Sequence, residues 1–173
     1  MAPTKNTDDL DLVLLDTASA GEVFVLQRAA FVDEALRYGT VELPPLTQTL
    51  DELVAELAAP DARALGLLDG HRLVGSVRVR RTDPDHCYIG RLVVAPDWRR
   101  LGLGSRLLDA AEALFPDARY LEMMTGAQSQ HLLDMYARRG YQEVSREILT
   151  PARIEHVNLV KDRHEERQPR PRQ

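Results

Sequence analysis

A short segment rich in arginine and glycine, Arg99-Arg100-Leu101-Gly102-Leu103-Gly104, carries the residues best suited to chemistry. It follows the apolar run from Cys87 to Val94, which we predict to be a strand, and it leads into a helix expected from about Ser105. The N-terminus of a helix has free N–H groups and a partial positive charge, so it binds phosphate groups when no side chain blocks them. Gly102 and Gly104 leave that space. The pattern therefore predicts a pyrophosphate-binding loop.

Alternating strands and helices must position this loop. The periodicity predicts strands at 10–15, 62–68, 72–80, 87–94, 120–124, 142–149 and 154–160. It predicts helices over 20–37, from Thr49 onward, over 105–115 and over 128–139. The order β-α-α-β-β-β-α-β-α-β-β is typical of an α/β fold, here around one mixed, largely antiparallel sheet.

Local signals mark where these elements begin and turn. Ser19 is a candidate N-cap for the first helix, and Thr49 with Glu52 three residues on has the pattern of a capping box. Asp69-Gly70 between two apolar runs predicts a tight hairpin, because this pair tolerates positive φ angles. Gly140 is expected to end the helix before it.

The composition is that of an ordinary globular protein, with 173 residues, 44% of them hydrophobic and 28% charged. We expect a single domain over residues 10–160, because a chain of this size can bury one core. Residues 1–9 are predicted to be a flexible lead. Residues 161–173 are almost all charged, Gln or Pro and have nothing to bury, so we predict a disordered tail.

Charge and cysteine content exclude several classes of partner. The net charge of −5 argues against nucleic acid and anionic membranes, both of which attract basic surfaces. A lone cysteine, Cys87, allows no internal disulfide, and the spacing of the five histidines suggests no metal site. The first residues lack the apolar stretch of a signal peptide, and no run is long enough to span a membrane. We expect a cytoplasmic protein without a metal cofactor.

Two motifs resemble those of one enzyme family. The loop is similar to the acyl-CoA signature of the GNAT superfamily of N-acetyltransferases, Arg/Gln-x-x-Gly-x-Gly/Ala, with Arg99, Gly102 and Gly104 at its fixed positions. The preceding strand, which ends before Ala95-Pro96, resembles the family's fourth strand. Leu133 to Tyr141 is similar to the family's Leu-Tyr-x-x-x-Gly-Phe/Tyr segment. The resemblance covers about residues 10–161 and implies acetyl-CoA as cosubstrate.

The resemblance also implies a role for particular residues. The pyrophosphate would bind the main-chain N–H groups of Arg99, Arg100, Leu101, Gly102, Leu103, Gly104 and Ser105. The pantetheine arm would pair with the backbone of Leu92, Val93 and Val94, and the N–H of Val93 or Val94 would polarise the thioester carbonyl. Tyr136 stands where the family places the tyrosine that donates a proton to the coenzyme sulfur. Ser129 replaces an asparagine found in many members and can still hydrogen-bond.

Several points stay open at this stage. The acceptor is expected to be an amine, and the resemblance places its selectivity at about residues 31–50 and in the final hairpin. Glu34, Tyr38 and Glu42 either bind a cationic amine or form a solvated helix end. The general base is Asp85, His86, Glu122 or water, because Tyr88 stands where some members have glutamate. A non-catalytic acyl-CoA-binding module or sensor is the alternative to an enzyme. The sequence decides neither a homodimer through the final strands nor a preference for longer acyl groups.

Overall fold

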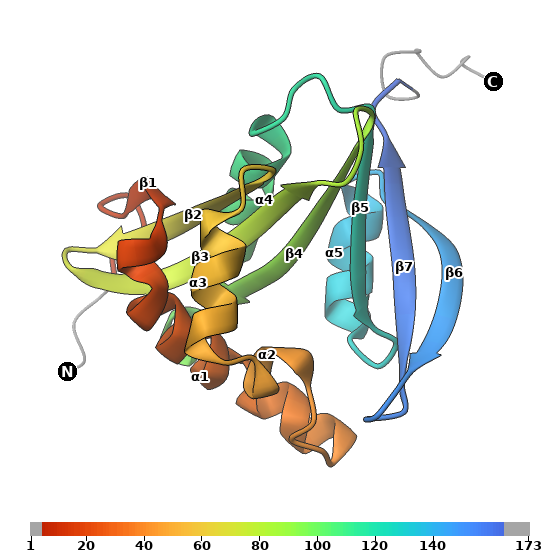
Figure 1. Cartoon of the computed structure of the whole chain (residues 1–173), viewed down its shortest axis with the longest axis horizontal. Helices are drawn as coiled ribbons and strands as arrows, with labels where there is room; N and C mark the ends of the chain where they lie inside the picture. Colours follow the sequence, from red (N-terminus) through yellow and green to blue (C-terminus); the bar gives the residue numbers. More distant parts are fainter. Residues whose placement is uncertain (1–4, 165–173) are drawn as a thin grey trace. The chain divides into compact units, whose positions relative to one another are not determined.

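The structure is a computed structural model that describes residues 5–164, and its elements lie in two compact units that we treat separately (Figure 1). The first unit contains the chain up to Arg80 and Ile89–Leu114, and the second contains Arg81–Tyr88 and the chain from Phe115 onward. Hydrogen bonding joins seven strands in the order β1-β2-β3-β4-β5-β7-β6. The predicted α/β fold with a mixed, mostly antiparallel sheet is confirmed. The single domain over 10–160 stays a prediction.

The strands of the first unit are β1 (Asp11–Leu15), β2 (Ala62–Asp69), β3 (Arg72–Arg81) and most of β4 (His86–Val94). β1 and β3 each pair antiparallel with β2. The predicted hairpin is present, but its central residues are Gly70 and His71, because Asp69 pairs with Arg72. Gly70 has φ 58°, which glycine adopts without strain.

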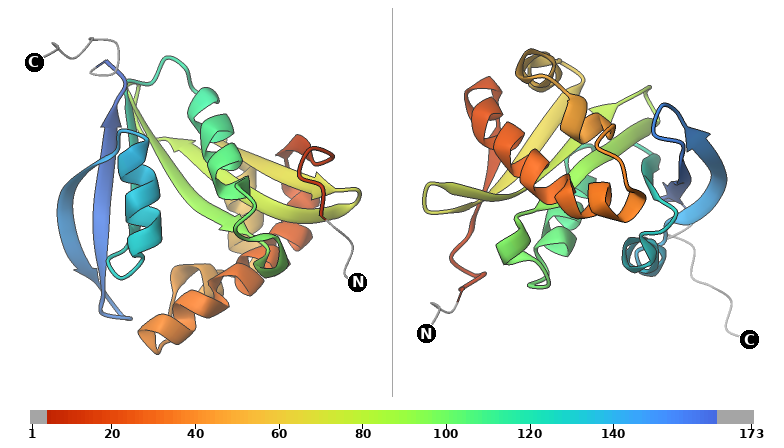
Figure 2. Two further views of the ribbon diagram at one scale, coloured as in Figure 1. Left: turned by 180° about the vertical axis from the view of Figure 1, so that it is seen from behind. Right: turned by 90° about the horizontal axis from the view of Figure 1, so that it is seen from below.

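Helices cover both faces of these strands (Figure 2). α1 (Ala20–Tyr38) and α3 (Leu50–Ala58) lie on one face, and α4 (Leu103–Ala113) lies on the other. The side chains of Leu53, Leu67, Val74, Val77, Leu107 and Leu108 are fully buried between these layers. A four-residue helix, α2 (Pro44–Thr47), lies between the two helices predicted over 20–37 and from Thr49, where no element was predicted. One turn is too short to show a helical period, although Pro44 at its first position is typical of a helix start.

The two predicted N-caps differ in the structure. Thr49 forms the predicted capping box, in which its Oγ1 accepts the Glu52 N–H at 3.2 Å and Glu52 Oε2 accepts the Thr49 N–H at 2.7 Å. Ser19 holds the N-cap position of α1, but its side chain makes no capping hydrogen bond. A 3₁₀ turn, η1 (Thr17–Ser19), precedes α1 and is capped by Asp16 instead, whose Oδ1 accepts the Ala18 N–H at 2.9 Å.

The second unit contains β5 (Tyr120–Gly126), α5 (Gln130–Arg138), β6 (Gln142–Leu149) and β7 (Ile154–Asp162). β7 pairs antiparallel with both β5 and β6. The start of β4 pairs in parallel with β5 through three residue pairs, from His86↔Tyr120 to Tyr88↔Glu122. β6 is the edge strand and exposes Val144 and Ile148. A homodimer through these strands stays a prediction.

The ends of the described chain are more ordered than the sequence suggested. Arg106 donates hydrogen bonds to the carbonyl oxygens of Thr7 and Leu10, at 2.9 and 2.8 Å, within and just after the predicted flexible lead. β7 continues two residues into the predicted tail, and Lys161 there is only 7% exposed. We ended the predicted strand at residue 160 because charged residues follow it. The apolar stem of a lysine can nevertheless pack in a protein interior, and Lys161 Nζ lies 5.7 Å from the centroid of the Tyr141 ring. The remaining parts of these predictions, residues 1–4 and 165–173, lie outside the described residues.

Two further sequence expectations bear on the core and on membranes. Cys87, in the predicted apolar strand, is fully buried, and burial raises the pKa of its thiol, so it packs as a small apolar residue. Across residues 5–164, no helix is both long enough and apolar enough to span a membrane.

Replacing Thr49 by Ala removes one half of the capping box, so we expect the free energy of unfolding to fall by about 1 kcal/mol. Ser19→Ala is the matched control, because Ser19 occupies the same position on α1 without a capping bond, and it should change stability by a few tenths of that amount at most. Urea denaturation of both variants measures the difference. Equal losses would contradict the assigned role of Thr49.

Candidate functional site

The Gly-containing loop leaves β4, passes through the 3₁₀ turn η2 (Pro96–Trp98) and enters α4. Arg100 and Gly102 have φ 61° and 81°, so the chain twice adopts the left-handed conformation before the helix begins. α4 starts at Leu103, two residues earlier than predicted, with Gly102 as its N-cap. Its first internal hydrogen bond runs from the Arg106 N–H to the Gly102 carbonyl oxygen at 3.1 Å. The first N–H groups of a helix, here those of Leu103 and Gly104, point out of its first turn.

The two glycines of the loop differ in their surroundings. The positive φ of Gly102 is strained for other residues. Gly104 lies in the first turn of α4, and in a helix interior alanine is favoured by about 1 kcal/mol over glycine. A Cβ atom at Gly104 would meet no heavy atom within 4 Å outside its own stretch of helix. Packing therefore does not require glycine at position 104, and a small residue there leaves room for a ligand to approach the backbone.

A pocket of about 290 Å³ lies against this loop in the first unit. Its lining residues are Thr7, Asp8, Leu101, Gly102, Leu103 and Arg106. Arg106 contributes a positive charge, and its guanidinium also holds the backbone of Thr7. Sequence reasoning missed Thr7, Asp8 and Arg106, because residues so far apart in the chain share no local pattern.

Ion pairs fix the loop on both sides. Arg99 donates to the Asp33 carboxylate and, at 2.7 Å, to the Ala30 carbonyl oxygen, so its side chain is bound to α1. The Arg72 guanidinium binds both carboxylate oxygens of Asp97, at 2.8 and 2.9 Å, and Lys5 binds the same carboxylate at 2.7 Å. Hydrogen bonds from Arg72 first, and then from Lys5, hold the pKa of Asp97 well below its usual range. The side chain of Arg99 thus anchors the loop, and its predicted phosphate contact would come from its main-chain N–H.

The end of β4 presents its backbone next to the loop. Val93 is buried, and Leu92 and Val94 are half-buried. All three lie beyond Tyr88↔Glu122, the last residue pair between β4 and β5. The Ala95 N–H donates to the Val74 carbonyl oxygen at 2.8 Å, which fixes the strand end on β3. The backbone predicted to bind the pantetheine arm therefore belongs to the same unit as the loop.

In the second unit, the C-terminal end of α5 positions Tyr136. The Tyr141 N–H donates to the Tyr136 carbonyl oxygen and the Gly140 N–H to that of Ala137, each at 3.1 Å. Gly140 has φ 86°, so this is a Schellman motif, and the predicted stop at Gly140 is confirmed. The rings of Tyr136 and Tyr141 pack edge to face, with their centroids 6.0 Å apart. Both tyrosines are buried, which gives the Tyr136 ring a fixed direction.

Ser129 precedes α5 and is also buried. Its carbonyl oxygen accepts the N–H groups of Leu132 and Leu133, at 2.9 and 3.1 Å, which places it at the first turn of the helix. Ser129 and Tyr136 thus mark the two ends of α5. Of the predicted site residues, Ser129 and Tyr136 therefore belong to the second unit, where they lie at the start and near the end of α5. The loop and Leu92 to Val94 belong to the first unit.

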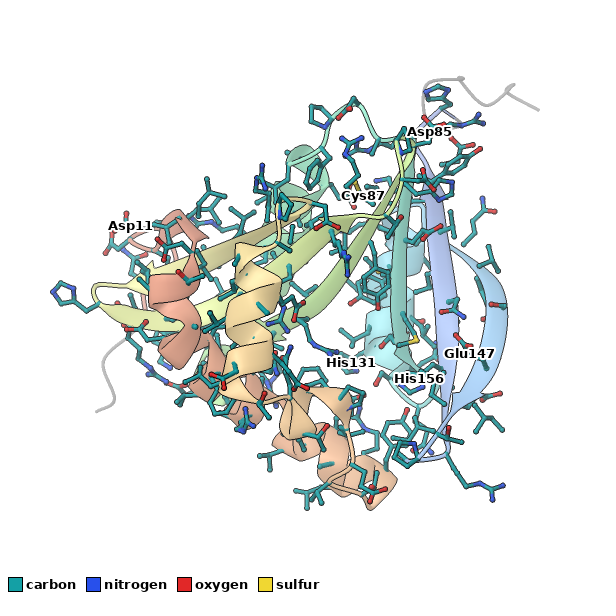
Figure 3. The ribbon with its side chains drawn as sticks, in the orientation of Figure 1. Asp11, Asp85, Cys87, His131, Glu147 and His156 are labelled. Carbon is teal, nitrogen blue, oxygen red and sulfur yellow. The ribbon has the colours of Figure 1, made fainter. Side chains whose placement is uncertain are left out.

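Two of the three candidate bases lie together. His86 Nδ1 is 2.6 Å from Glu122 Oε1, and the His86 ring packs 4.6 Å from that of Tyr120. Asp85 lies outside this pair, exposed in the turn between β3 and β4 (Figure 3). A hydrogen-bonded carboxylate and imidazole can accept and pass on a proton, so His86 and Glu122 form the chemically more capable group.

Residues 5–164 hold no group of three or more His, Cys, Asp or Glu side chains arranged to bind a metal ion. They do hold buried guanidinium nitrogens without a hydrogen-bond acceptor that sequence reasoning missed, in the half-buried Arg28 and Arg91 and the buried Arg78. The signal for one of them is visible in the sequence, because Arg78 interrupts the otherwise apolar or small run Leu73-Val74-Gly75-Ser76-Val77.

Comparison with known proteins identifies the family. The model of the acetyltransferase (GNAT) family matches residues 28–141, which is more than half of the chain and includes both predicted motifs. The chain belongs to the GNAT acetyltransferase family. This family uses acetyl-CoA.

Solved structures share the GNAT fold at low sequence identity. The ribosomal-protein-S18-alanine N-acetyltransferase of Escherichia coli is 15% identical, with a TM-score of 0.71 over 88% of this chain and 93% of that one. The PaiA N-acetyltransferase of Thermoplasma acidophilum, solved in complex with coenzyme A, is 13% identical, with a TM-score of 0.68 over 89% and 99%. The UPF0157 protein YqkA of Bacillus subtilis is 27% identical over 124 residues, 72% of this chain. The chain spans about a third of the length of that curated relative, since the match covers 35% of it.

The ion pairs of Asp97 predict an acid-sensitive loop in this GNAT protein. The pKa of Asp97 is lower in the folded chain than in the unfolded chain, so its contribution to stability is present above about pH 4 and is lost as the pH falls further. We expect the melting temperature of Asp97→Asn to lie below that of the parent at pH 7 and the difference to shrink toward pH 2. Asp11→Asn, which alters an exposed carboxylate on β1 (Figure 3), is the control and should show no such trend. A difference that is constant with pH would contradict the role of Asp97.

Proposed function

We propose that this protein is an N-acetyltransferase that moves the acetyl group of acetyl-CoA to a primary amine of a small molecule or protein, by direct attack of the amine in a ternary complex. The observation that carries the proposal is the start of α4, where outward-pointing N–H groups coincide with a glycine that packing does not require. The coenzyme fits this environment, because a pyrophosphate needs both the donors and the space.

The residues of the first unit would bind and orient the coenzyme. The main-chain N–H groups from Arg99 to Ser105 bind the pyrophosphate, and the backbone of Leu92 to Val94 pairs with the pantetheine arm. The bound coenzyme supplies an acetyl group that is already activated as a thioester. The N–H of Val93 or Val94 donates a hydrogen bond to the thioester carbonyl oxygen, which stabilises the charge that develops there.

The residues of the second unit would handle protons. Tyr136 donates its hydroxyl proton to the departing thiolate, and Ser129 hydrogen-bonds to the coenzyme. The attacking amine must also lose a proton, which passes to the His86 and Glu122 pair or to water. The packing of Tyr136 against Tyr141 supports this assignment, because a proton donor works efficiently when its direction is fixed.

Gly104→Val separates coenzyme binding from folding. We expect the stability of the free protein to change by only a few tenths of a kcal/mol, because valine is no worse a helix former than glycine and a Cβ atom at this position enters open space. Acetyl-CoA at 100 times its dissociation constant should stabilise the parent by about 2.7 kcal/mol. The same concentration should stabilise Gly104→Val much less, because the branched side chain, unlike the glycine or alanine of the signature, occupies the space the pyrophosphate needs. Thermal melting with and without acetyl-CoA measures both effects.

Gly21→Val is the matched control, since Gly21 also lies in the first turn of a helix with nothing within 4 Å of an added Cβ atom. It should keep the full response to acetyl-CoA. A normal response in Gly104→Val, or no response in the parent at saturating acetyl-CoA, would overturn the assignment of the loop.

Tyr136→Phe tests whether the protein is an enzyme or a sensor. The ring and its packing against Tyr141 are retained, so coenzyme affinity should change little. Loss of a general acid should lower kcat by about 10²- to 10⁴-fold, with a parallel fall in kcat/KM. The assay follows release of free coenzyme A thiol with an amine that the parent acetylates.

Unchanged turnover in Tyr136→Phe would refute the role of Tyr136 as proton donor. A parent protein that binds acetyl-CoA tightly but acetylates no amine of a broad panel would instead be an acyl-CoA-binding module or sensor.

A further inference from the structure

Three arginines in the first unit, Arg28 on α1, Arg78 on β3 and Arg91 on β4, each have at least one buried guanidinium nitrogen without a hydrogen-bond acceptor, and we call them the arginine cluster. Alternation along β3 sets the direction of Arg78. A Cβ atom on Gly75 would lie 2.9 Å from Leu107 of α4, so residue 75 faces α4. Arg78, an odd number of residues further on, faces α1 and α3, as its contacts with Gln27 and Glu56 confirm.

A ring of polar contacts holds Arg78 in place. Its Nη2 donates to Gln27 Oε1 at 2.5 Å, and the Gln27 amide in turn donates to Gln48 Oε1 at 3.0 Å. The Gln48 amide donates to Glu56 Oε2 at 2.7 Å, and Glu56 Oε1 lies 3.2 Å from Arg78 Nε. Arg28 joins the ring through its Nη2, which donates to the Gln48 carbonyl oxygen at 2.8 Å.

The ring does not satisfy the donors that it holds. Nη1 of Arg28, Nε and Nη1 of Arg78, and Nε of Arg91 are buried without a hydrogen-bond acceptor, and the contact of Arg78 Nε with Glu56 lacks hydrogen-bond geometry. Arg78 is only 6% exposed. Burial lowers its pKa to about 10, a change that Glu56 opposes and the neighbouring charge of Arg91 reinforces. Buried guanidinium donors are costly unless an acceptor pairs with them.

An anion is the group that these donors lack. The cluster and its ring contain three guanidinium groups and one carboxylate, Glu56, so they carry an excess of positive charge. Guanidinium groups bind carboxylate and phosphate oxygens through charge-assisted, often bidentate hydrogen bonds. An oxyanion would thus supply both hydrogen-bond acceptors and the negative charge that balances the arginines. A neutral group could supply acceptors but no charge, and a cation would add to the positive charge.

We propose that the arginine cluster binds an oxyanion, a carboxylate or a phosphate, on the amine acceptor itself. The acceptor is then a small amine that also carries a negative group, such as an amino acid or an aminoalkyl phosphate. This deepens the proposed function and rests on it.

The position of the cluster favours the acceptor over the coenzyme as its ligand. Arg91 directly precedes Leu92, and at about 3.3 Å per residue along a strand its Cα lies within about 7 Å of that of Val93. Val93 is one of the residues proposed to orient the thioester carbonyl. Gln48, which bridges Arg28 and the ring around Arg78, lies in the segment 31–50 where acceptor selectivity is expected. The pyrophosphate, in contrast, is assigned to the loop at Gly102.

Matched pairs of acceptors test the charge requirement in the parent protein. Each pair differs only in the anionic group: amino acids against their carboxamides, and phosphoethanolamine against ethanolamine. We expect kcat/KM to be at least about tenfold higher for the anionic member of one type of pair, and the type that shows the effect identifies carboxylate or phosphate. Equal or faster acetylation of the uncharged member in every pair would overturn the proposal.

Arg91→Gln should raise KM for the preferred anionic amine by about 10- to 100-fold and should leave KM for its uncharged counterpart unchanged. Arg28→Gln should also raise KM for the anionic amine, and it replaces Arg91→Gln in the test if that variant does not fold. Arg80→Gln is the control, because Arg80 lies on the same strand as Arg78 but is exposed and pairs with Asp61 at the surface. An equal effect of Arg91→Gln on both members of the pair would contradict anion recognition.

A binding measurement without acetyl-CoA keeps this inference separate from the proposed function. The anionic amines, but not their uncharged counterparts, should raise the melting temperature of the parent and of Arg80→Gln, and the shift should vanish in Arg91→Gln. If this pattern appears while no amine is acetylated, the anion site stands and the transferase proposal fails. If amines are acetylated but no anionic member stabilises the protein, the transferase stands and the anion site fails.

Discussion

The direction in which the chain enters α4 is the constraint on which the candidate coenzyme site depends. Main-chain N–H groups cannot be re-aimed by changing a side chain, so their direction must come from the path of the backbone. Left-handed φ angles at Arg100 and Gly102 set that path. Asp97, held by Arg72 and Lys5, and Arg99, held by α1, then fix the loop on either side of it. The charged side chains of Asp97 and Arg99 thus anchor the loop, while the backbone of the loop faces the pocket.

A different constraint governs the opposite face of β3. An apolar residue at position 78 would pack beneath α1 and α3 without desolvating a charge, and replacing buried ion pairs by apolar residues is often neutral or stabilising. The chain instead buries a guanidinium, lowers its pKa and leaves two of its nitrogens without acceptors. Such a conflict between local sequence and stability is expected at functional sites rather than in a purely structural core. The arginine cluster is the place in the described chain where that conflict is most developed.

How far the sequence predicts the structure depends on how local each signal is. The capping box at Thr49 and the helix end at Gly140 depend on residues a few positions apart, and both were predicted correctly from spacing. α2 was not predicted, because a single turn is too short to show a helical period. The hairpin turn was predicted one residue too early, because the register of two strands is set by their pairing rather than by the turn residues alone. The arginine cluster depends on contacts such as that of Gln27 with Arg78, 51 residues apart, which no window of sequence contains. The order β5-β7-β6 is non-local in the same way.

This difference in locality also explains how the family can keep a fold and a coenzyme while its sequences diverge. Structures only 13% and 15% identical to this chain share its fold with TM-scores of 0.68 and 0.71. Recognition through main-chain N–H groups constrains few side chains beyond the glycines that expose them, so most of the loop's neighbours are free to change. The acceptor site that we propose is built from side chains instead. It would depend on side chains from α1, α3, β3 and β4, which can be replaced together without disturbing the start of α4. An acceptor specificity built on Arg28, Arg78 and Arg91 is therefore a property of this chain's own residues, and membership of the family does not imply it.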